Sequence, residues 1–238
     1  MSKTLFISDL HLCNKSPKIT AAFLHFLHHE ARYADALYIL GDLFDSWIGD
    51  DDINPLHDHV ACMLRQLSIP CHFLHGNRDF LLGKSFASRA GIHIIPDASI
   101  LELHGQRLLI MHGDKLCTRD MTYQIYRQYI HKDWLKKFFL SLPIYIRKRI
   151  AFKIRSYSQE TNNSKNIDIM DVSLHAVSSL MCQHQAFILI HGHTHRPTVH
   201  KFTINGQSAQ RWVLGDWSEQ GSMISVSHKD IQFITFSL

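Results

Sequence analysis

Residues 4–12 read TLFISDLHL, a short run of β-forming residues that leads into an aspartate and a histidine. Short apolar runs of this kind predict buried strands. Four further runs share this form, at residues 36–40, 71–74, 108–111 and 186–190. Each of the five runs is followed within three residues by side chains that can bind a metal, in the order DLH (9–11), GD (41–42), GNRD (76–79), HGD (112–114) and HGHTH (191–195). The pattern predicts a buried sheet whose strands lead into ligand-bearing loops.

The remaining periodicity predicts what surrounds that sheet. Residues 19–31 and 56–67 have apolar side chains at helical spacing, and such helices supply the crossovers that parallel strands need. The end of the chain predicts antiparallel strands at residues 199–204, 211–214, 223–226 and 231–236. We therefore expect an α/β fold in which two packed sheets are flanked by helices.

Length and composition bound the class of protein. The chain has 238 residues, 45% hydrophobic and 19% charged, so it can bury a core, and collagen-like, low-complexity and largely disordered classes are excluded. No run reaches the roughly 18 apolar residues of a membrane-spanning helix, and residues 5–7 are too short for a signal-peptide core. The five cysteines are an odd, widely spaced set without a C-x-x-C pair, which argues against a disulfide framework or zinc knuckle and favours a reducing cytosol.

Positive charge is concentrated in residues 119–165. This segment holds eleven Lys and Arg against three Asp and Glu, a net charge of +8, whereas the rest of the chain carries −4. Apolar side chains recur in it at helical steps, and Pro143 interrupts the pattern: Tyr123, Tyr126, Ile130, Trp134 and Phe138. We expect two or more basic amphipathic helices, which suit an anionic amphiphile or a membrane surface better than nucleic acid. An ordinary helical subdomain packed on the core is the alternative.

The polar side chains after the strands form a candidate metal centre. In an α/β sheet, the loops beyond the carboxyl ends of the strands line one crevice, so these side chains can converge. Asp9 and His11 are two residues apart, as are His193 and His195, so each pair projects to one side of an extended backbone. The candidate ligands offer only oxygen and nitrogen donors: Asp9, His11, Asp42, Asn77, His112, His193 and His195.

Seven ligands are more than a single ordinary site uses, which indicates two cations. Two divalent ions held roughly 3.5 to 4 Å apart can share one carboxylate, and Asp42 is the natural bridge. Two carboxylates leave such a centre electropositive, so it can hold a hydroxide and an anionic phosphate. This predicts hydrolysis of a phosphate ester or anhydride, while donor type alone leaves Mn²⁺, Fe²⁺ and Zn²⁺ open. His191, Asp79 and Asp114 are expected to support ligands or local turns, with Asp79 as a partner of Arg78.

Other catalytic motifs are absent from the sequence. The segment Gly83-Lys84-Ser85 resembles the end of a phosphate-binding loop, but Arg78 stands where the first glycine belongs. No G-x-S-x-G elbow and no G-x-G-x-x-G fingerprint occurs. Serine-hydrolase and dinucleotide-binding functions are therefore unsupported.

The motifs DLH, GDLFD, GNRD, HGD and GHTH occur in the order typical of the calcineurin-like metallophosphoesterase superfamily, which the chain resembles over most of its length. The longer stretches ISDLHL, LGDLFDSWIG, HGNRDF, MHGD and IHGHTHRP are similar to its family of UDP-2,3-diacylglucosamine pyrophosphohydrolases of lipid A synthesis. The resemblance implies a two-sheet αββα sandwich formed by residues 1–118 and 166–238, with residues 119–165 inserted as a helical cap over acyl chains.

The same resemblance implies an activity and its site. The substrate would be UDP-2,3-diacylglucosamine, cleaved at its pyrophosphate to UMP and 2,3-diacylglucosamine 1-phosphate. The reaction would take place at the cytoplasmic face of the inner membrane with two Mn²⁺ ions. Apart from the resemblance, we expect no nucleic-acid partner, and no protein partner is evident from the sequence. One ion would be held by Asp9, His11, Asp42 and His195, and the other by Asp42, Asn77, His112 and His193. Substrate contacts are implied for Asn77, Arg78, Asp120, Ser158, Asn162, Lys165 and His193, with catalytic roles for Asn77, Arg78 and His193.

Two other functions are open at this point. A different dimetal phosphoesterase could act on a soluble nucleotide or phosphodiester, but such a substrate would not need the apolar face of residues 119–165. A non-catalytic scaffold could keep the fold as a binding surface. Such a scaffold could dispense with ligands, yet all seven are present.

Overall fold

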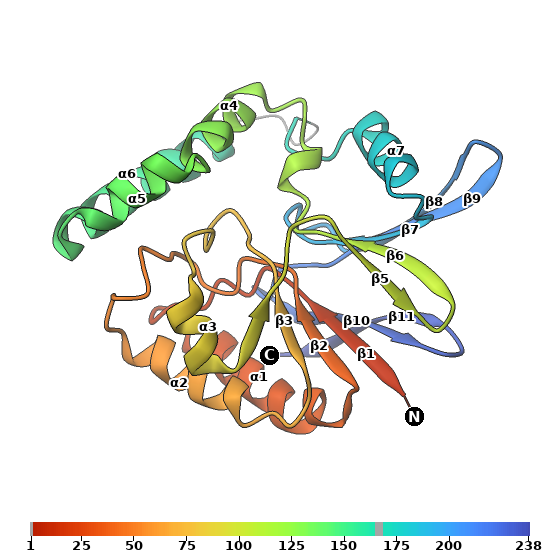
Figure 1. The fold of residues 1–238 in the computed structure, drawn as a ribbon, viewed down its shortest axis with the longest axis horizontal. Coiled ribbons are helices and arrows are strands. Elements are labelled where there is room, and N and C mark those ends of the chain that lie inside the picture. The colour runs from red at the N-terminus through yellow and green to blue at the C-terminus, as the bar shows by residue number, and fades with distance from the viewer. Residues whose placement is uncertain (1, 165–168) are drawn as a thin grey trace.

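The computed structural model describes residues 2–164 and 169–238, which form two packed sheets with helices on both outer faces (Figure 1). The first sheet has the order β11 (Ile231–Ser237), β10 (Gln220–Ser227), β1 (Lys3–Ile7), β2 (Ala36–Ile39), β3 (Cys71–Phe73) and β4 (Ile92–Ile94). The second has the order β5 (Ser99–Leu103), β6 (Gln106–Ile110), β7 (Ile188–His191), β9 (Gln207–Val213) and β8 (Thr198–Ile204). The first sheet is covered by α1 (Pro17–His29), α2 (Pro55–Arg65) and α3 (Lys84–Ala90), and the second by α7 (Leu174–Gln183). Short 3-10 helices are η1 (Ala31–Tyr33) and η2 (Asp114–Leu116).

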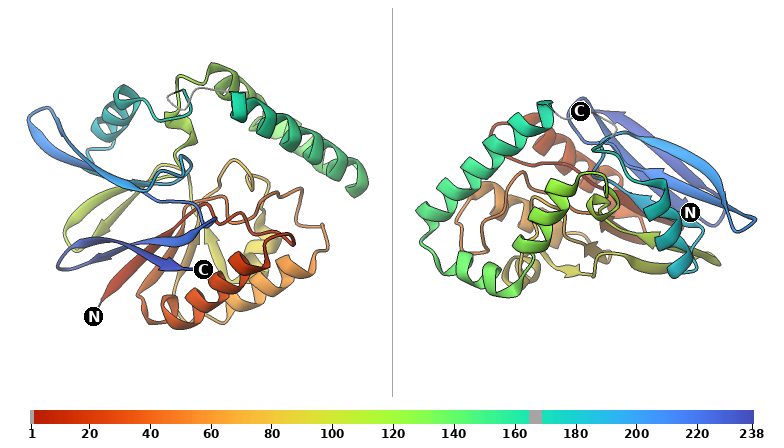
Figure 2. Two further views of the ribbon diagram at one scale, coloured as in Figure 1. Left: turned by 180° about the vertical axis from the view of Figure 1, so that it is seen from behind. Right: turned by 90° about the horizontal axis from the view of Figure 1, so that it is seen from above.

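Alternation along the strands builds three apolar cores. Leu5 and Ile7 of β1 pack with the helices of the first sheet, while Phe6 between them packs with the second sheet. In β6, Leu108 packs between the sheets and Leu109 packs with α7. Successive side chains of a strand point to opposite faces, so one strand serves two cores. The predicted αββα sandwich is confirmed, and its layers can be followed from two further directions in Figure 2.

Parallel pairing brings the ends of the ligand-bearing strands to one edge. β1 to β4 pair parallel in the first sheet, and β6, β7 and β9 pair parallel in the second. The loops after β1 and β2 are joined by the N–H of His11, which donates to the carbonyl oxygen of Asp42 (3.0 Å). The loops after β6 and β7 are joined by the N–H of Gly192, which donates to the carbonyl oxygen of His112 (2.9 Å). The ligand loops therefore share one crevice.

Some elements differ from the expectation. The five core strands and the first two helices begin and end within two residues of the predicted bounds, but β4, β5, α3 and α7 were not predicted. β4 and α3 are too short to give a clear periodicity. β9 is antiparallel to β8, as expected, but it also pairs parallel with β7. A local pattern cannot show this second partner, because it depends on a distant strand.

Three helices, here called the cap, lie over the loops that follow β2 and β3: α4 (Met121–Ile130), α5 (Asp133–Ser141) and α6 (Ile144–Ser164) (Figure 1). Pro143 separates α5 from α6, as predicted. The predicted apolar stripe is divided between α4 and α5, because the backbone is extended at Lys132. Asp133 in the first turn of α5 complements the helix dipole and favours a new start there. Within the described ranges, no helix has the length and apolarity needed to cross a membrane.

Helix α6 is fastened to the acidic loop after β2. Three ion pairs do this: Arg147 with Asp51, Lys148 with Asp52 (Nζ to Oδ1, 2.8 Å) and Arg155 with Asp45 (Nη1 to Oδ1, 2.5 Å). Arg147 is buried, and its guanidinium also donates to the carbonyl oxygen of Ile48 (2.7 Å). Ion pairs within the chain therefore neutralise part of the positive charge counted in residues 119–165.

Asp50 holds the same loop against the start of α3. Its carboxylate accepts hydrogen bonds from the N–H groups of Gly83 (2.8 Å) and Phe86 (2.9 Å). We predict that Asp50→Ala lowers the free energy of unfolding by about 1 to 2 kcal/mol, because two helix-start N–H groups lose their acceptor. Equilibrium urea denaturation measures this change. As a control, Glu102→Ala removes an exposed carboxylate and should change stability by less than about 0.5 kcal/mol; equal stability of both variants would contradict the prediction.

Candidate metal centre

The backbone is strained at most of the predicted ligands. Five of them have φ in the left-handed region: Asp9 (58°), His11 (50°), Asp42 (52°), His193 (68°) and His195 (54°). Such conformations cost side chains other than glycine on the order of 1 to 3 kcal/mol each. They persist where the surrounding structure enforces them, and they gather at functional sites. The loop ends of β1, β2 and β7 therefore have the character of a functional site.

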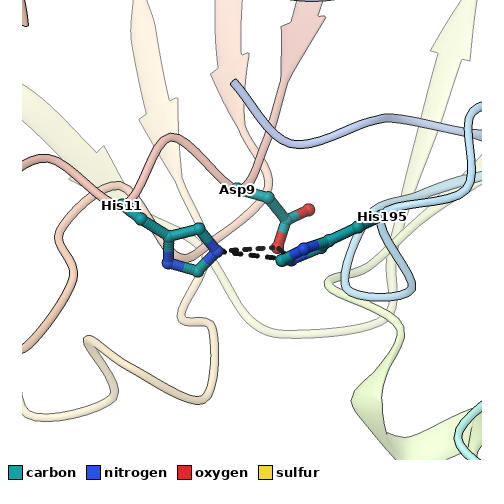
Figure 3. A group of neighbouring side chains, drawn as sticks. All are labelled: Asp9, His11 and His195. Carbon is teal, nitrogen blue, oxygen red and sulfur yellow. Dashed lines mark hydrogen bonds and ion pairs between the residues drawn. The ribbon is translucent and has the colours of Figure 1, made fainter. Parts of the chain in front are cut away.

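Asp9, His11 and His195 form the first cluster (Figure 3). Oδ1 of Asp9 lies 3.3 Å from Nε2 of His195 and 4.0 Å from Nε2 of His11, and these two nitrogens are 3.3 Å apart. Oδ1 of Asp9 is buried and has no hydrogen-bond partner among the described residues. A buried carboxylate oxygen that faces two imidazole nitrogens without a hydrogen bond fits a bound cation.

Asn77, His112 and His193 form the second cluster. Oδ1 of Asn77 lies 2.9 Å from Nε2 of His112 and 2.9 Å from Nδ1 of His193, and the two ring nitrogens are 3.2 Å apart. Nδ1 of His112 lies 2.9 Å from the carbonyl oxygen of Leu40. A carbonyl only accepts hydrogen bonds, so Nδ1 carries a proton, and Nε2 is the ring nitrogen that faces Asn77 and His193, where a cation would be bound.

Asp42 lies between the two clusters. Its Oδ1 is 3.8 Å from Nε2 of His112, and its Oδ2 is 3.9 Å from Nδ1 of His11. Ligand atoms of Asp9, Asp42 and His112 lie within 4.8 Å of one another, so Asp9 also reaches both clusters. Two carboxylates, one amide oxygen and four imidazoles are a donor set that fits two divalent cations. The structure brings all seven predicted side chains together, and their role as ligands stays a prediction.

Burial shapes the charge of this centre. It raises the pKa of Asp42 to about 7 against the opposing effect of His112, and the nearby Asp79 and Asp9 add to the rise. Burial alone would lower the pKa of His112, but Asp42 and Asp9 raise it to about 9. Burial and the neighbouring His112 lower the pKa of His193 to about 4. Positive charge is therefore favoured beside the carboxylates, while the imidazole of His193 is neutral and able to ligate.

Asp79 fixes the backbone of two ligand loops. It is fully buried, and its carboxylate accepts hydrogen bonds from the N–H groups of Leu43 (2.8 Å), Gly76 (2.9 Å) and Asp42 (3.3 Å). The contact with Gly76 closes a local turn, as expected, but the remaining contacts go to the loop after β2 rather than to Arg78. The GNRD motif draws attention to Asp79 in the sequence. Only the fold shows which N–H groups donate hydrogen bonds to its carboxylate.

The neighbours of the ligands hold their loops closely together. A Cβ atom on Gly76 would lie 2.1 Å from Oδ1 of Asp42, and a Cβ atom on Gly192 would lie 2.1 Å from Oδ2 of Asp9. Neither position has room for a side chain. Nδ1 of His191 lies 2.8 Å from the carbonyl oxygen of Gly192, and burial lowers the pKa of His191 to about 3. His191 thus contacts its own loop as a neutral imidazole, and its expected support of the ligands stays a prediction.

A cavity of about 320 Å³ adjoins the second cluster. It is lined by Asn77 and Arg78 after β3 and by apolar side chains of the core and cap, including Trp47, Phe80, Ile130, Leu135, Phe139 and Ile150. The N–H of Arg78 donates to Oδ1 of Asp42 (2.7 Å), so Arg78 belongs to both the candidate metal centre and the cavity. Trp134, which helical spacing placed on the same stripe, does not line the cavity and is 64% exposed.

Two other implied substrate contacts, Asp120 and Ser158, do not line this cavity. Asp120 is buried, and its carboxylate caps the N-terminus of α4 by accepting a hydrogen bond from the N–H of Tyr123 (3.1 Å). Ser158 lies half-buried on α6. The side chain of Asn162 and all of Lys165 lie outside the described residues. The structure thus brings Asn77, Arg78 and His193 together and leaves the contacts implied for residues 120–165 as predictions.

Comparison with known proteins agrees with this geometry. The family model for calcineurin-like phosphoesterases matches residues 2–197. The chain is 56% identical over 236 residues to proteins named UDP-2,3-diacylglucosamine hydrolase from Escherichia coli O7:K1 and Escherichia fergusonii, covering 98% of each chain.

Solved structures share the fold at low sequence identity. A novel archaeal phosphodiesterase is 11% identical with a TM-score of 0.53, covering 99% of both chains. Vacuolar protein sorting 29 from Cryptosporidium parvum is 12% identical with a TM-score of 0.50, covering 100% of this chain and 98% of that one. These likenesses show the fold alone. Because the family model covers the sheets and the loops that bear the clustered side chains, the chain belongs to the calcineurin-like phosphoesterase family.

Proposed function

We propose that this protein hydrolyses the pyrophosphate bond of UDP-2,3-diacylglucosamine, releasing UMP and 2,3-diacylglucosamine 1-phosphate for lipid A synthesis. The observation that carries the proposal is the continuity between Arg78, which contacts Asp42, and an apolar cavity under the cap. A substrate with both a pyrophosphate and acyl chains matches these two surfaces. The 56% identity to proteins named for this substrate supports the same choice.

The proposal includes two divalent cations, with Mn²⁺ as the preferred ion. Asp9, His11, Asp42 and His195 would hold one, and Asp42, Asn77, His112 and His193 the other. When bound, such a pair activates water and stabilises negative charge on a phosphoryl group. The orphaned Oδ1 of Asp9 and the convergence of Asn77, His112 and His193 support this assignment.

Arg78 contributes a fixed positive charge next to the phosphates. Its backbone is tied to Asp42, so its side chain starts from a defined position at the cavity wall. Protein phosphatases of this superfamily resemble the chain here but carry histidine in a GNHE motif. A nucleotide or sugar phosphate is a better leaving group than an alkoxide, so an arginine that stabilises charge can replace a proton donor.

The alternatives fit the site less well. A dimetal phosphoesterase for a soluble substrate has no use for the apolar wall formed by side chains such as Phe139 and Ile150. A non-catalytic scaffold has no use for five left-handed backbone positions at potential ligands.

We also propose that the cap binds the surface of the inner membrane, where a diacylated substrate resides. Trp134 and Tyr145 are 64% and 67% exposed. Lys137, Arg149 and Lys153 make no ion pair within the described part of the chain, so they can meet lipid phosphates.

We predict that the purified protein with Mn²⁺ and UDP-2,3-diacylglucosamine releases UMP, and that it binds two Mn²⁺ ions per chain. Asp42→Asn keeps the shape of the side chain but removes its charge, so it should lower activity about a hundredfold or more and reduce bound Mn²⁺. Nucleotide release and metal analysis measure the two effects. Asp58→Asn, at an exposed carboxylate of α2, is the control and should change neither. No UMP from this substrate, with hydrolysis of simple phosphodiesters, would favour the soluble-substrate alternative.

We predict that Phe139→Ser lowers kcat/KM for the diacylated substrate about tenfold to a hundredfold, because an apolar wall worth about 1.5 to 3 kcal/mol is lost. Hydrolysis of the soluble bis(p-nitrophenyl) phosphate should change less than about twofold, since it places no chain in the cavity. Met121→Ser alters an exposed side chain of α4 that does not line the cavity, and it should leave both rates unchanged. Equal losses on both substrates would argue against acyl binding.

For the membrane surface, we predict that Trp134→Ser combined with Tyr145→Ser weakens sedimentation with phosphatidylglycerol vesicles about tenfold, because two exposed aromatic side chains no longer enter the interface. Vesicle co-sedimentation in low salt measures the binding. As a control, Tyr33→Ser removes an equally exposed aromatic side chain that lies in η1, outside the cap. This variant should bind vesicles like the wild type. A wild-type protein that stays in the supernatant would contradict membrane binding.

A further inference from the structure

The turn after His112 contains a buried carboxylate that reaches the cap. Asp114 is 2% exposed, and its Oδ2 accepts hydrogen bonds from the hydroxyl of Tyr123 (2.8 Å) and from Nε of Arg127 (2.5 Å). Its backbone carbonyl oxygen accepts a third hydrogen bond, from Nε2 of Gln124 (2.8 Å). One residue of the core therefore binds three side chains of α4.

These polar contacts attach α4 to the core, because the helix has little apolar burial of its own. No residue of α4 is buried, and its half-buried residues are Tyr123, Gln124, Arg127 and Ile130. Three of these four bind Asp114, so little apolar burial is left to hold the helix. The position of α4 consequently depends on Asp114 and its partners.

Arg127 connects this attachment to a second carboxylate beside a predicted ligand. Its Nη2 lies 3.8 Å from Oδ2 of Asp97. Oδ1 of Asp97 accepts the backbone N–H of His112 (3.3 Å). Arg127 thus lies between two carboxylates. Asp114 belongs to the loop that contains His112, and Asp97 is linked to that loop by its hydrogen bond with the N–H of His112.

Tyr123 extends the same network to the second histidine of that cluster. Its ring centroid is 6.0 Å from that of His193. Burial and the carboxylate of Asp114 raise the pKa of Tyr123 well above its ordinary value, so the hydroxyl stays a hydrogen-bond donor. The cap therefore packs a fixed ring beside His193.

We propose that Arg127 is a positioning residue that fixes the α4 end of the cap to the His112 and His193 side of the candidate metal centre. This role rests on the proposed metal centre and is exerted through Asp114 and Asp97, without contact to the reacting groups. Without the guanidinium, Asp114 would keep a buried charge with only Tyr123 as a side-chain donor. Both α4 and the turn after His112 would then lose their fixed geometry.

Three variants of the full-length protein test this role. Arg127→Met keeps most of the side-chain length and removes the charge, whereas Arg127→Lys restores the charge. Arg89→Met breaks an exposed Arg–Asp pair on the core and is the matched control. Two measurements are made on each: hydrogen exchange of residues 121–130 without added metal, and calorimetric titration with Mn²⁺.

In Arg127→Met, we expect exchange in α4 to accelerate about tenfold or more while the sheets stay protected. Mn²⁺ affinity should fall about tenfold, as it does when residues that orient metal ligands are removed. Arg127→Lys should recover most of both properties, and Arg89→Met should match the wild type. If Arg127→Met does not fold, Arg127→Gln is compared with Arg127→Lys in the same two measurements.

Faster exchange with unchanged Mn²⁺ affinity would reduce Arg127 to a structural contact and overturn the proposal. Unchanged exchange in the Met or Gln variant would overturn it as well. A wild-type protein that binds no Mn²⁺ would overturn the proposed metal centre and this role with it. That failure is distinct, because exchange in α4 reports on the attachment without any metal.

Discussion

Two buried carboxylates, Asp9 and Asp42, can lie close together only if donors and positive charge surround them. The fold supplies N–H donors from distant loops: that of His193 to Asp9 (2.8 Å) and that of Arg78 to Asp42 (2.7 Å). Each donor belongs to a candidate ligand or to its neighbour, so satisfying the carboxylates also sets the positions of other side chains. These N–H groups do not fully compensate the negative charge of Asp9 and Asp42. The remaining charge lies next to imidazole side chains, and divalent cations would balance it.

The same requirement accounts for the strained turns. The N–H of Asp9 donates to the carbonyl oxygen of Gly41 (3.2 Å) and that of His11 donates to Asp42 (3.0 Å), while both residues keep left-handed backbone. The strands that precede these turns have apolar cores on both faces, so the turns cannot relax by moving the strands. Packing of the two sheets therefore offsets the backbone strain in these turns. The apolar cores on both faces of the strands hold the candidate ligands in place.

The sequence predicted the parts of the structure that depend on short-range pattern. Buried strands are recognised from short runs of apolar, β-forming residues. A residue that follows a strand must lie near the strand's carboxyl end, so the seven candidate ligands could be found from the sequence alone. Contacts between charged groups far apart in the chain could not. Counting charge in residues 119–165 overestimated the free positive charge, because Arg147 and Arg155 pair with Asp51 and Asp45 of a loop about a hundred residues earlier. The contacts of Asp114 with Tyr123 and Arg127 span only 9 and 13 residues, but they were missed too, because a local pattern does not show how a helix lies against the turn that precedes it.

Polar attachment of the cap has a consequence for the cavity beneath it. If α4 and α5 were held by apolar packing, their inward side chains would meet the core and fill the space, since protein interiors close to high density. Neither helix buries a residue, and the cap is instead joined to the core by ion pairs at Asp114 and at the loop after β2. Side chains such as Leu135 and Phe139 are thereby left to line a cavity. These polar contacts at the edges of the cap hold it away from the core and leave an apolar cavity, which would accept the acyl chains of the proposed substrate.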